Sequence, residues 1–165
     1  MNPEGGGCSE LRSRHCTPSS LGKREAVDEL KALAPDVIVV TAYGRILPLS
    51  VLGIPPRGIL NIHPSLLPKY RGPSPVATAI LDGQSRVGVT LMLLDEGMDT
   101  GDILAQRETA VLPGETGGEL TARLFRLGAE LLQDTFPGWL AGSVSPVPQD
   151  DARALLESER RLLYV

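Results

Sequence analysis

The sequence predicts an α/β protein with a Rossmann-like, three-layer fold, in which helices flank a mostly parallel sheet. Two observations lead to this prediction. Short runs of β-branched and aliphatic residues, typical of strands covered on both faces of a parallel sheet, alternate along the chain with segments of helical periodicity. The composition, with 42% hydrophobic and 22% charged residues among 165, is that of one soluble globular domain.

Charge and hydropathy exclude several classes of function. A formal net charge of -4 gives no general attraction to nucleic acid or to an anionic membrane surface. The apolar runs are strand-length and fall short of the roughly 20 residues that span a bilayer. No positively charged start is followed by an apolar signal region. We therefore expect a cytoplasmic protein without a membrane partner.

The two cysteines do not indicate a metal site. Cys8 and Cys16, with His15 beside the second, lie in a leader rich in glycine, serine and arginine. Their spacing fits no closed zinc site, and we expect free thiols and no bound metal.

Regular structure is expected to begin after a disordered leader at residues 1–22, which has many turn formers and no apolar periodicity. Residues 23–34 carry the apolar stripe of a surface helix, which Pro35 ends. Residues 36–44 (DVIVVTAYG) form a β-branched run typical of a strand buried on both faces. Residues 58–63 (GILNIH) form a second, shorter run.

A well-marked helix is expected after the second strand. Ser74 stands where an N-cap belongs, Pro75 takes the first helical position, and Gly83 lies just past the end. Residues 87–95 (VGVTLMLLD) then predict a buried strand. Residues 102–111 (DILAQRETAV) alternate in the manner of a strand at a sheet edge.

The longest helix is expected to start at Thr116, which stands in capping-box spacing with Glu119 before a long apolar stripe. Pro137 and Gly138 should break or kink this helix. The tail at residues 151–165 has the pattern of an amphipathic helix, and nothing in it indicates chemistry.

The segment NIHPSLLPKYRG, residues 61–72, contains the first candidate site. Asn61 and His63 are two apart at the end of a predicted strand, so their side chains should point to the same face. Pro64 then stiffens the backbone, and ligands in such sheets gather outside the carboxyl ends of the strands. A converging amide and imidazole can donate hydrogen bonds to one oxygen, which is what the oxyanion of acyl transfer needs.

A carboxylate beside His63 would hold its tautomer and favour its protonated form. Asp99 lies in the glycine-flanked stretch GMDTG, where backbone freedom could turn a carboxylate back towards the cleft. The plain alternative is that Asn61 and His63 cap a turn and that EGMDTGD is an acidic surface loop. The acidic candidates near the end of the next strand are Asp95, Glu96, Asp99 and Asp102.

At these residues the sequence also resembles a known family. The motifs NIHPSLLPKYRGPSPV and GVTLMLLDEGMDTGDIL are similar to those of the formyltransferase catalytic domain, which uses 10-formyltetrahydrofolate to formylate an amine. The resemblance extends from about Pro35 to Asp150, and two separated motifs agree in order and context. It implies that Asn61 and a protonated His63 stabilise the oxyanion and that Asp99 supports proton transfer.

The resemblance also implies where the formyl donor, 10-formyltetrahydrofolate, would bind. The SLLP turn would form part of the tetrahydrofolate site: Ser65, Leu66, Leu67 and Pro68. The YGRIL segment would form one wall of the pterin pocket: Arg45, Ile46 and Leu47. No metal is implied.

The motifs also bear on the acceptor amine. RGPSPV and DEGMDTGD resemble both the branch that formylates initiator methionyl-tRNA and the formyltransferase domains of sugar-modifying enzymes, and PDVIVVTAYGRILP points the same way. We put the methionyl-tRNA branch first, which makes this tRNA the expected partner. The alternatives are the branch that formylates glycinamide ribonucleotide, which shares NIHPSLLPKY, and the branch that formylates amino sugars. The competing interpretation from another class is a chain without catalysis, which acts at most as a folate-binding or interaction module.

This chain departs from the family's sequence pattern near both of its ends. Residues 1–22 bear no likeness to the strand, helix and strand with which family members begin, so we expect a sheet that is incomplete on its N-terminal side. The chain leaves the pattern after PVPQD, before the β-barrel domain with which the methionyl-tRNA branch continues. We therefore expect a truncated chain, with a partial catalytic domain at residues 23–150 and slow turnover.

Overall fold

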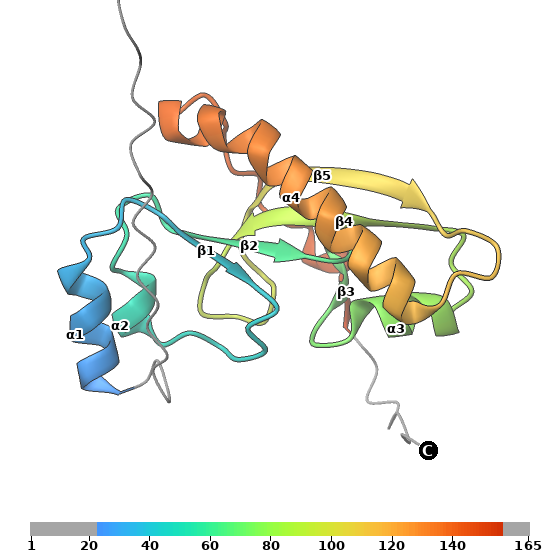
Figure 1. Cartoon of the computed structure of the whole chain (residues 1–165), viewed down its shortest axis with the longest axis horizontal. Coiled ribbons are helices and arrows are strands. Elements are labelled where there is room, and N and C mark those ends of the chain that lie inside the picture. The colour runs from blue at the N-terminus through green and yellow to red at the C-terminus, as the bar shows by residue number, and fades with distance from the viewer. Residues whose placement is uncertain (1–22, 157–165) are drawn as a thin grey trace, which may run out of the picture.

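The computed structural model describes residues 23–156, so the predicted leader at residues 1–22 and residues 157–165 lie outside the described residues. Two sheets and their helices make up this part of the chain (Figure 1). No helix in it is long and apolar enough to cross a membrane. In chain order the elements are α1 (Arg24–Ala32), β1 (Ile38–Thr41), α2 (Leu49–Leu52), β2 (Ile59–His63), β3 (Lys69–Arg71), α3 (Pro75–Leu81), β4 (Arg86–Leu93), β5 (Ile103–Ala110), α4 (Gly117–Ala141), the 3-10 helix η1 (Asp151–Arg153) and β6 (Leu155–Leu156).

The main sheet is mixed, with strand order β1-β2-β4-β5. Only β1 and β2 pair in parallel, whereas β2 pairs antiparallel with β4 and β4 antiparallel with β5. The α/β class is confirmed, but the prediction of a mostly parallel sheet is wrong for the described strands. For β4 and β5 the reason lies in their connection, because residues 94–102 hold no crossover helix and a parallel pair would need one.

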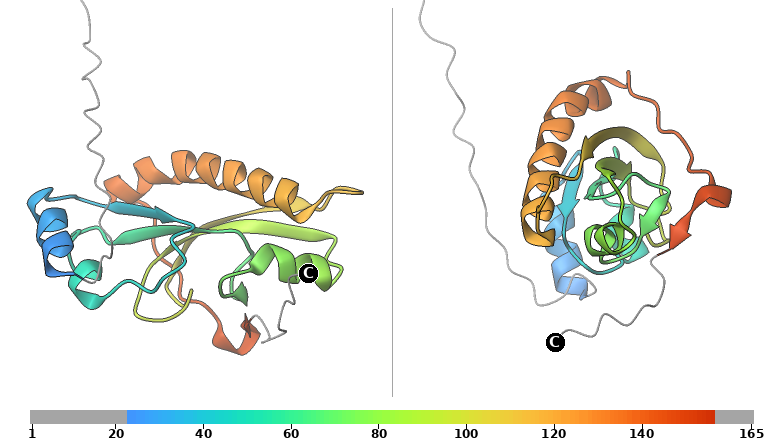
Figure 2. Two further views of the ribbon diagram at one scale, coloured as in Figure 1. Left: turned by 60° about the horizontal axis from the view of Figure 1, so that its bottom comes forward. Right: turned by 90° about the vertical axis from the view of Figure 1, so that its right-hand side faces the viewer.

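The layers are those predicted, with helices on both sides of the sheet (Figure 2). α4 runs along one face, α3 and the small β3–β6 sheet lie on the other, and α1 and α2 lie at the end where β1 and β2 begin. Beneath α4, β2 and β4 contribute Leu60, Ile62, Val89 and Leu91 to a buried cluster around Leu131. Because side chains alternate along a strand, the residues of β2 between these positions point away from α4.

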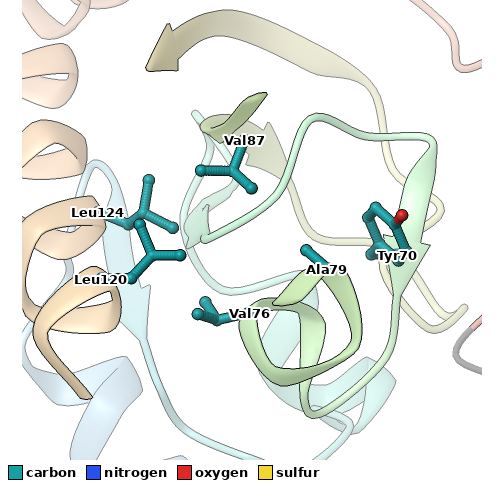
Figure 3. Packing of buried hydrophobic residues seen from close by; sticks show 6 residues of the cluster. All are labelled: Tyr70, Val76, Ala79, Val87, Leu120 and Leu124. Carbon is teal, nitrogen blue, oxygen red and sulfur yellow. The ribbon is translucent and has the colours of Figure 1, made fainter. Parts of the chain in front are cut away.

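A second buried cluster joins α4 to α3 across the start of β4 (Figure 3). Because Val76 lies in the first turn of α3, its packing against Leu120 and Leu124 holds the start of α3 beside the sheet. Each such buried aliphatic side chain contributes roughly 1.5–3 kcal/mol to folding. The members of the cluster are Tyr70, Val76, Ala79, Val87, Leu120 and Leu124.

α4 starts where the sequence predicts. Thr116 and Glu119 form the capping box, in which Glu119 N donates to Thr116 Oγ1 at 3.3 Å and Thr116 N donates to Glu119 Oε2 at 2.9 Å. The hydrogen bonds that Thr116 gives to the carboxylate, the backbone one first, lower the pKa of Glu119. The predicted boundaries of α3 are also confirmed, with Ser74 at the N-cap position and Pro75 first in the helix.

The predicted break at Pro137 and Gly138 is wrong, because α4 continues through both residues to Ala141. Tertiary contacts hold this last turn. The indole Nε1–H of Trp139 donates to the Arg57 carbonyl at 3.2 Å, and the ring packs against the cluster around Leu131. These contacts outweigh the helix hydrogen bond that a proline removes.

β1 does not have the two-sided cover that its β-branched run predicts. Its residues alternate between half-buried and exposed, and Val39 is 40% exposed. Within the described residues β1 is one of the two edge strands of the main sheet, with β2 as its one neighbour. Ile38 and Val40 face the other way, towards the cluster of Val27 and Val51 that joins α1 and α2 to the sheet.

Residues 151–156 do not form the start of the predicted amphipathic helix, and residues 157–165 lie outside the described residues. Residues 151–156 instead form η1 and then β6, which pairs in parallel with β3. The buried guanidinium of Arg71 fixes this segment, because it donates hydrogen bonds to Gln149 at 2.8 Å and to Asp151 at 2.7 Å. A buried charge requires such acceptors, and this requirement overrides the helical periodicity of the segment.

The packing of α4 on β2 predicts a difference between two glycine substitutions in the same helix. A Cβ at Gly128 would overlap Ile62 Cγ2 and lie 3.1 Å from Val89 Cγ2, whereas a Cβ at Gly118 would meet nothing within 4 Å. We expect Gly128→Ala to lower the free energy of unfolding by about 1–3 kcal/mol through overpacking. Gly118→Ala should leave it unchanged or raise it by up to about 1 kcal/mol. Urea denaturation of both variants checks this, and equal effects would contradict the packing described.

Candidate active site

A cavity of about 590 Å³ opens beyond the carboxyl ends of β1 and β2, the parallel pair of the sheet. Its wall comes from the loop after β1, the end of β2, the loop into α3 and the loop after β4, with Thr121 and Phe125 of α4. The volume falls within the range of small-molecule sites, roughly 300–1,000 Å³. The cavity therefore lies where ligands bind in α/β sheets.

Asn61 and His63 both line this cavity from the end of β2, as their spacing predicts. The register with β4, in which Asn61 is opposite Met92 and His63 opposite Thr90, fixes both positions. His63 is 4% exposed. The Asn61 side-chain amide makes no hydrogen bond with any other residue in the range 23–156, so its N–H donors are available to a ligand oxygen.

Asp99 reaches the same cavity from the loop after β4. Its Oδ1 lies 3.6 Å from His63 Nδ1, and its Oδ2 accepts a hydrogen bond from Gly72 N at 2.9 Å. Asp99 adopts the left-handed conformation, with a φ of 54°, which turns the loop back over the sheet. The structure thus brings the three predicted catalytic residues together around one volume.

The His63 ring is held on its other side as well. His63 Nε2 lies 2.9 Å from the carbonyl oxygen of Tyr70. A carbonyl only accepts, so Nε2 carries the hydrogen in this contact, and Nδ1 is the nitrogen that faces Asp99. Each ring nitrogen of His63 therefore faces an oxygen acceptor.

The other acidic candidates have different surroundings. Asp95 lines the cavity, but its carboxylate accepts hydrogen bonds from Thr100 Oγ1 at 2.7 and 2.8 Å and from Gly97 N at 3.0 Å. It therefore shapes the loop that carries Asp99. Glu96 is exposed and Asp102 lies beyond the loop; neither lines the cavity.

The predicted folate-binding residues divide into two groups. The YGRIL segment lines the cavity through Arg45, Ile46 and Leu47. The SLLP turn, which contains Ser65, Leu66, Leu67 and Pro68, does not line it. That turn lies against β4 instead, where the Leu66 side chain lies over Gly88.

Thr90 of β4 explains the position of the SLLP turn. Its hydroxyl is 0% exposed, donates to the Ser65 carbonyl at 2.7 Å and accepts from Leu67 N at 3.1 Å. The amide of Gln106 donates to the same hydroxyl and to the Leu67 carbonyl, both at 2.8 Å. The turn is thus a buried support behind the end of β2.

Sequence reasoning missed the residues that surround the three predicted catalytic ones. Tyr70, Arg71 and Gln149 contact His63, the tail and the Asp99 loop, respectively. Their roles depend on β3 and on its pairing with β6, and three- and two-residue strands carry no periodic signal in a sequence. The one available hint was a polar Gln-Asp pair between a proline and a helical pattern.

With this geometry established, comparison with known proteins identifies the family. The sequence model described as "Formyl transferase" matches residues 5–136. The chain belongs to the formyl transferase family. The match begins upstream of Pro35, so the expectation that residues 1–22 bear no likeness to the family is wrong for residues 5–22. A leader without periodicity or motifs gave no sign of it.

Two curated relatives of this chain share one description. The chain is 56% identical over 138 residues to "Methionyl-tRNA formyltransferase" from Roseiflexus sp. (strain RS-1), covering 84% of this chain and 42% of the relative. It is 47% identical over 132 residues to the protein of that name from Myxococcus xanthus (strain DK1622), covering 80% and 42%. The chain therefore spans less than half the length of these curated relatives.

Solved structures of other formyl transferases share the fold. Phosphoribosylglycinamide formyltransferase from Bacillus halodurans matches with a TM-score of 0.65 and 35% identity, covering 71% of this chain and 60% of that one. A formyltransferase from Anoxybacillus kamchatkensis, in complex with UDP-4,6-dideoxy-4-formamido-L-AltNAc and tetrahydrofolate, matches with a TM-score of 0.67 and 27% identity, covering 74% and 64%. Both confirm the formyltransferase fold predicted from the motifs.

The hydrogen bonds of Thr90 predict a large cost for a small substitution. Thr90→Val keeps the side-chain shape but leaves the Leu67 N–H and the Ser65 carbonyl without their partner. We expect the free energy of unfolding to fall by about 2 kcal/mol, because buried polar groups lose their hydrogen bonds. Thr78→Val is the matched control, since Thr78 Oγ1 bonds only within α3, to Ser74 O at 3.1 Å, and should cost about 0.5 kcal/mol or less. Equal losses for the two variants, measured by urea denaturation, would argue against the role given to Thr90.

Proposed function

We propose that this chain transfers a formyl group from 10-formyltetrahydrofolate to an amine, and that the amine is the amino group of initiator methionyl-tRNA. One observation carries the proposal: Asn61, His63 and Asp99 meet in one cavity in a member of the formyl transferase family. We place the reaction in the cytoplasm.

The cavity suits the formyl donor. Its lining includes apolar side chains, among them Ile46 and Leu47, against which a flat ring can pack. Its inner end has the amide of Asn61 and the ring of His63, which can donate to a carbonyl oxygen. Within residues 23–156, no group of three or more His, Cys, Asp or Glu side chains is placed to hold a metal ion.

The bound donor supplies a formyl carbon attached to N10 of the folate, which the amine attacks. Asn61 donates an N–H to the oxygen that becomes negatively charged. His63 donates from Nδ1, because its 3.6 Å distance to Asp99 is longer than a hydrogen bond and leaves this nitrogen open to a substrate oxygen. Two such donors stabilise the oxyanion where it forms.

Proton balance falls to Asp99. The attacking nitrogen loses one proton as the new C–N bond forms, and N10 gains one as the old C–N bond breaks. The negative charge of Asp99 stabilises the His63 imidazolium before this transfer. Asp99 then accepts the first proton, directly or through a water, and returns it to N10 as the old C–N bond breaks. Gly72 N holds the carboxylate in place through Oδ2 and leaves Oδ1 for this work.

The curated relatives at 47–56% identity support methionyl-tRNA as the acceptor. The glycinamide ribonucleotide and amino-sugar alternatives rest on solved structures that are less similar, at 27–35% identity. Because the chain spans less than half of the curated relatives, their support applies to the matched region alone.

The mechanism predicts the effect of three single substitutions. Asn61→Ala, His63→Ala and Asp99→Asn should each lower the single-turnover formylation rate by roughly 10²–10³-fold, since each removes one transition-state interaction. Asp134→Asn is the control for Asp99→Asn, because Asp134 also faces a cation, Arg107 at 2.7 Å, but on the exposed side of α4. Its rate should match that of the unmodified chain. A rate for Asp99→Asn equal to that of the control would remove Asp99 from the mechanism.

The acceptor is tested with the unmodified chain, 10-formyltetrahydrofolate and three amines offered separately: charged initiator tRNA, glycinamide ribonucleotide and a nucleotide-linked amino sugar. We expect tetrahydrofolate to be released with the charged tRNA only. Release of tetrahydrofolate with only one of the other two amines would identify that amine as the acceptor instead. Folate binding by equilibrium dialysis without release for any amine would support the non-catalytic alternative.

A further inference from the structure

Gln149, which lies shortly before η1, has a side-chain amide whose hydrogen-bonding capacity is filled. Its Oε1 accepts from Arg71 Nε at 3.1 Å and from Arg71 Nη2 at 2.8 Å. Its Nε2 donates to the carbonyl of Asp99 at 2.9 Å and to the carbonyl of Gly101 at 2.7 Å. The amide has one orientation only, because a flip would set Oε1 against two carbonyls and the NH2 group against a guanidinium.

Arg71 provides a fixed base for this amide. Its side chain is 6% exposed, and it also pairs with Asp151 at 2.7 Å. A buried guanidinium that lost its acceptors would be costly, so Arg71 and Gln149 hold each other in place. Gln149 lies outside residues 5–136, the part of the chain that the family's sequence model matches.

The carbonyls that Gln149 holds belong to the loop that carries the Asp99 carboxylate. This loop is tightly placed at Gly101, where a Cβ would overlap the Leu93 carbonyl, and Asp99 has a left-handed backbone. Donors on two carbonyls of such a loop fix the direction in which the Asp99 side chain leaves it.

The neighbours of Arg71 hold the rest of the site. The Tyr70 carbonyl binds His63 Nε2, and Gly72 N binds Asp99 Oδ2. Burial, followed by the hydrogen bond to Asp82, raises the pKa of Tyr70, in line with a side chain anchored in the core. Tyr70 and Arg71 of β3, and Gly72 directly after it, are consecutive residues. They hold, in that order, the His63 imidazole, the segment with Gln149 and Asp151, and the Asp99 carboxylate.

We propose that Gln149, held by buried Arg71, is a positioning residue that aims the Asp99 carboxylate at His63. This role rests on the proposed function of Asp99, but the geometry can be tested without turnover. Gln149 touches no reacting atom; it acts through the backbone of the Asp99 loop.

The test is Gln149→Glu, which keeps an acceptor for Arg71 and removes the donor to the loop. The second carboxylate oxygen would then face the carbonyls of Asp99 and Gly101, which repel it. We expect the loop to shift and the hydrogen bond from Gly72 N to Asp99 Oδ2 to weaken. Amide hydrogen exchange of Gly72, followed by NMR on the full chain, should become about tenfold faster. Core amides such as that of Leu91 should not change.

Two further variants give the upper and lower limits for the change in Gly72 amide exchange. Asp99→Ala removes the acceptor of the Gly72 amide altogether and gives the maximum acceleration. Gln133→Glu makes the same chemical change at an exposed position of α4 and should leave Gly72 exchange as it is. If Gln149→Glu does not fold, Gln149→Met, which has similar volume and no hydrogen bonds, replaces it. Unchanged Gly72 exchange in a folded Gln149 variant, or an equal change in Gln133→Glu, would overturn the proposal.

A rate measurement separates this inference from the proposed function. If the unmodified chain formylates an amine, Gln149→Glu should lower kcat about tenfold with a much smaller change in KM. The reason is that the Asp99 carboxylate loses its orientation while substrate binding is kept. A rise in KM with kcat intact would contradict a positioning role. If the unmodified chain formylates nothing, the proposed function fails, and the exchange of Gly72 still decides whether Gln149 aims Asp99.

Discussion

The site depends on a loop that folds back on itself. β4 runs antiparallel to β2, and Leu93, its last residue, pairs with Leu60 near the start of β2, three residues before His63. A loop that simply continued would carry Asp99 away from the imidazole. The left-handed turn at Asp99 and its hydrogen bond from Gly72 reverse that direction, so the carboxylate comes within 3.6 Å of the ring. The proposed oxyanion donors, Asn61 and His63, both come from β2. Asp99, the charged partner of His63, reaches the ring only because its loop turns back.

The features that can be predicted from the sequence are those that follow from local rules. Strand alternation places Asn61 and His63 on one face whatever their neighbours are, and both line the cavity. The capping box of Thr116 and Glu119 is formed by residues three apart, and it is present as predicted. Asp99 was singled out because glycines flank it, and glycine-rich loops can make the reversal that is seen.

The remaining features depend on partners distant in the sequence. The direction of β4 is set by what it pairs with, and its apolar run is the same for either direction. The SLLP turn faces inwards because of Thr90, and Pro137 is accommodated because of Trp139, which lies against Arg57. β6 and the orientation of Gln149 follow from the buried charge of Arg71. No window of the sequence shows such long-range bonds, and several of them support the site.

The central claim is that Asn61 and His63 together meet the formyl oxygen of the folate. The chain contains two asparagines and two histidines, so selective 15N labelling of their side chains gives few signals, and Asn2→Gln and His15→Gln variants assign them. The most direct measurement is an NMR titration of this protein with 5-formyltetrahydrofolate, an isomer that does not donate its formyl group. The account predicts that the Asn61 amide and the His63 ring both shift in proportion to bound ligand, and that the Asn61 amide protons exchange more slowly with water. Binding that leaves both side chains unchanged would contradict it.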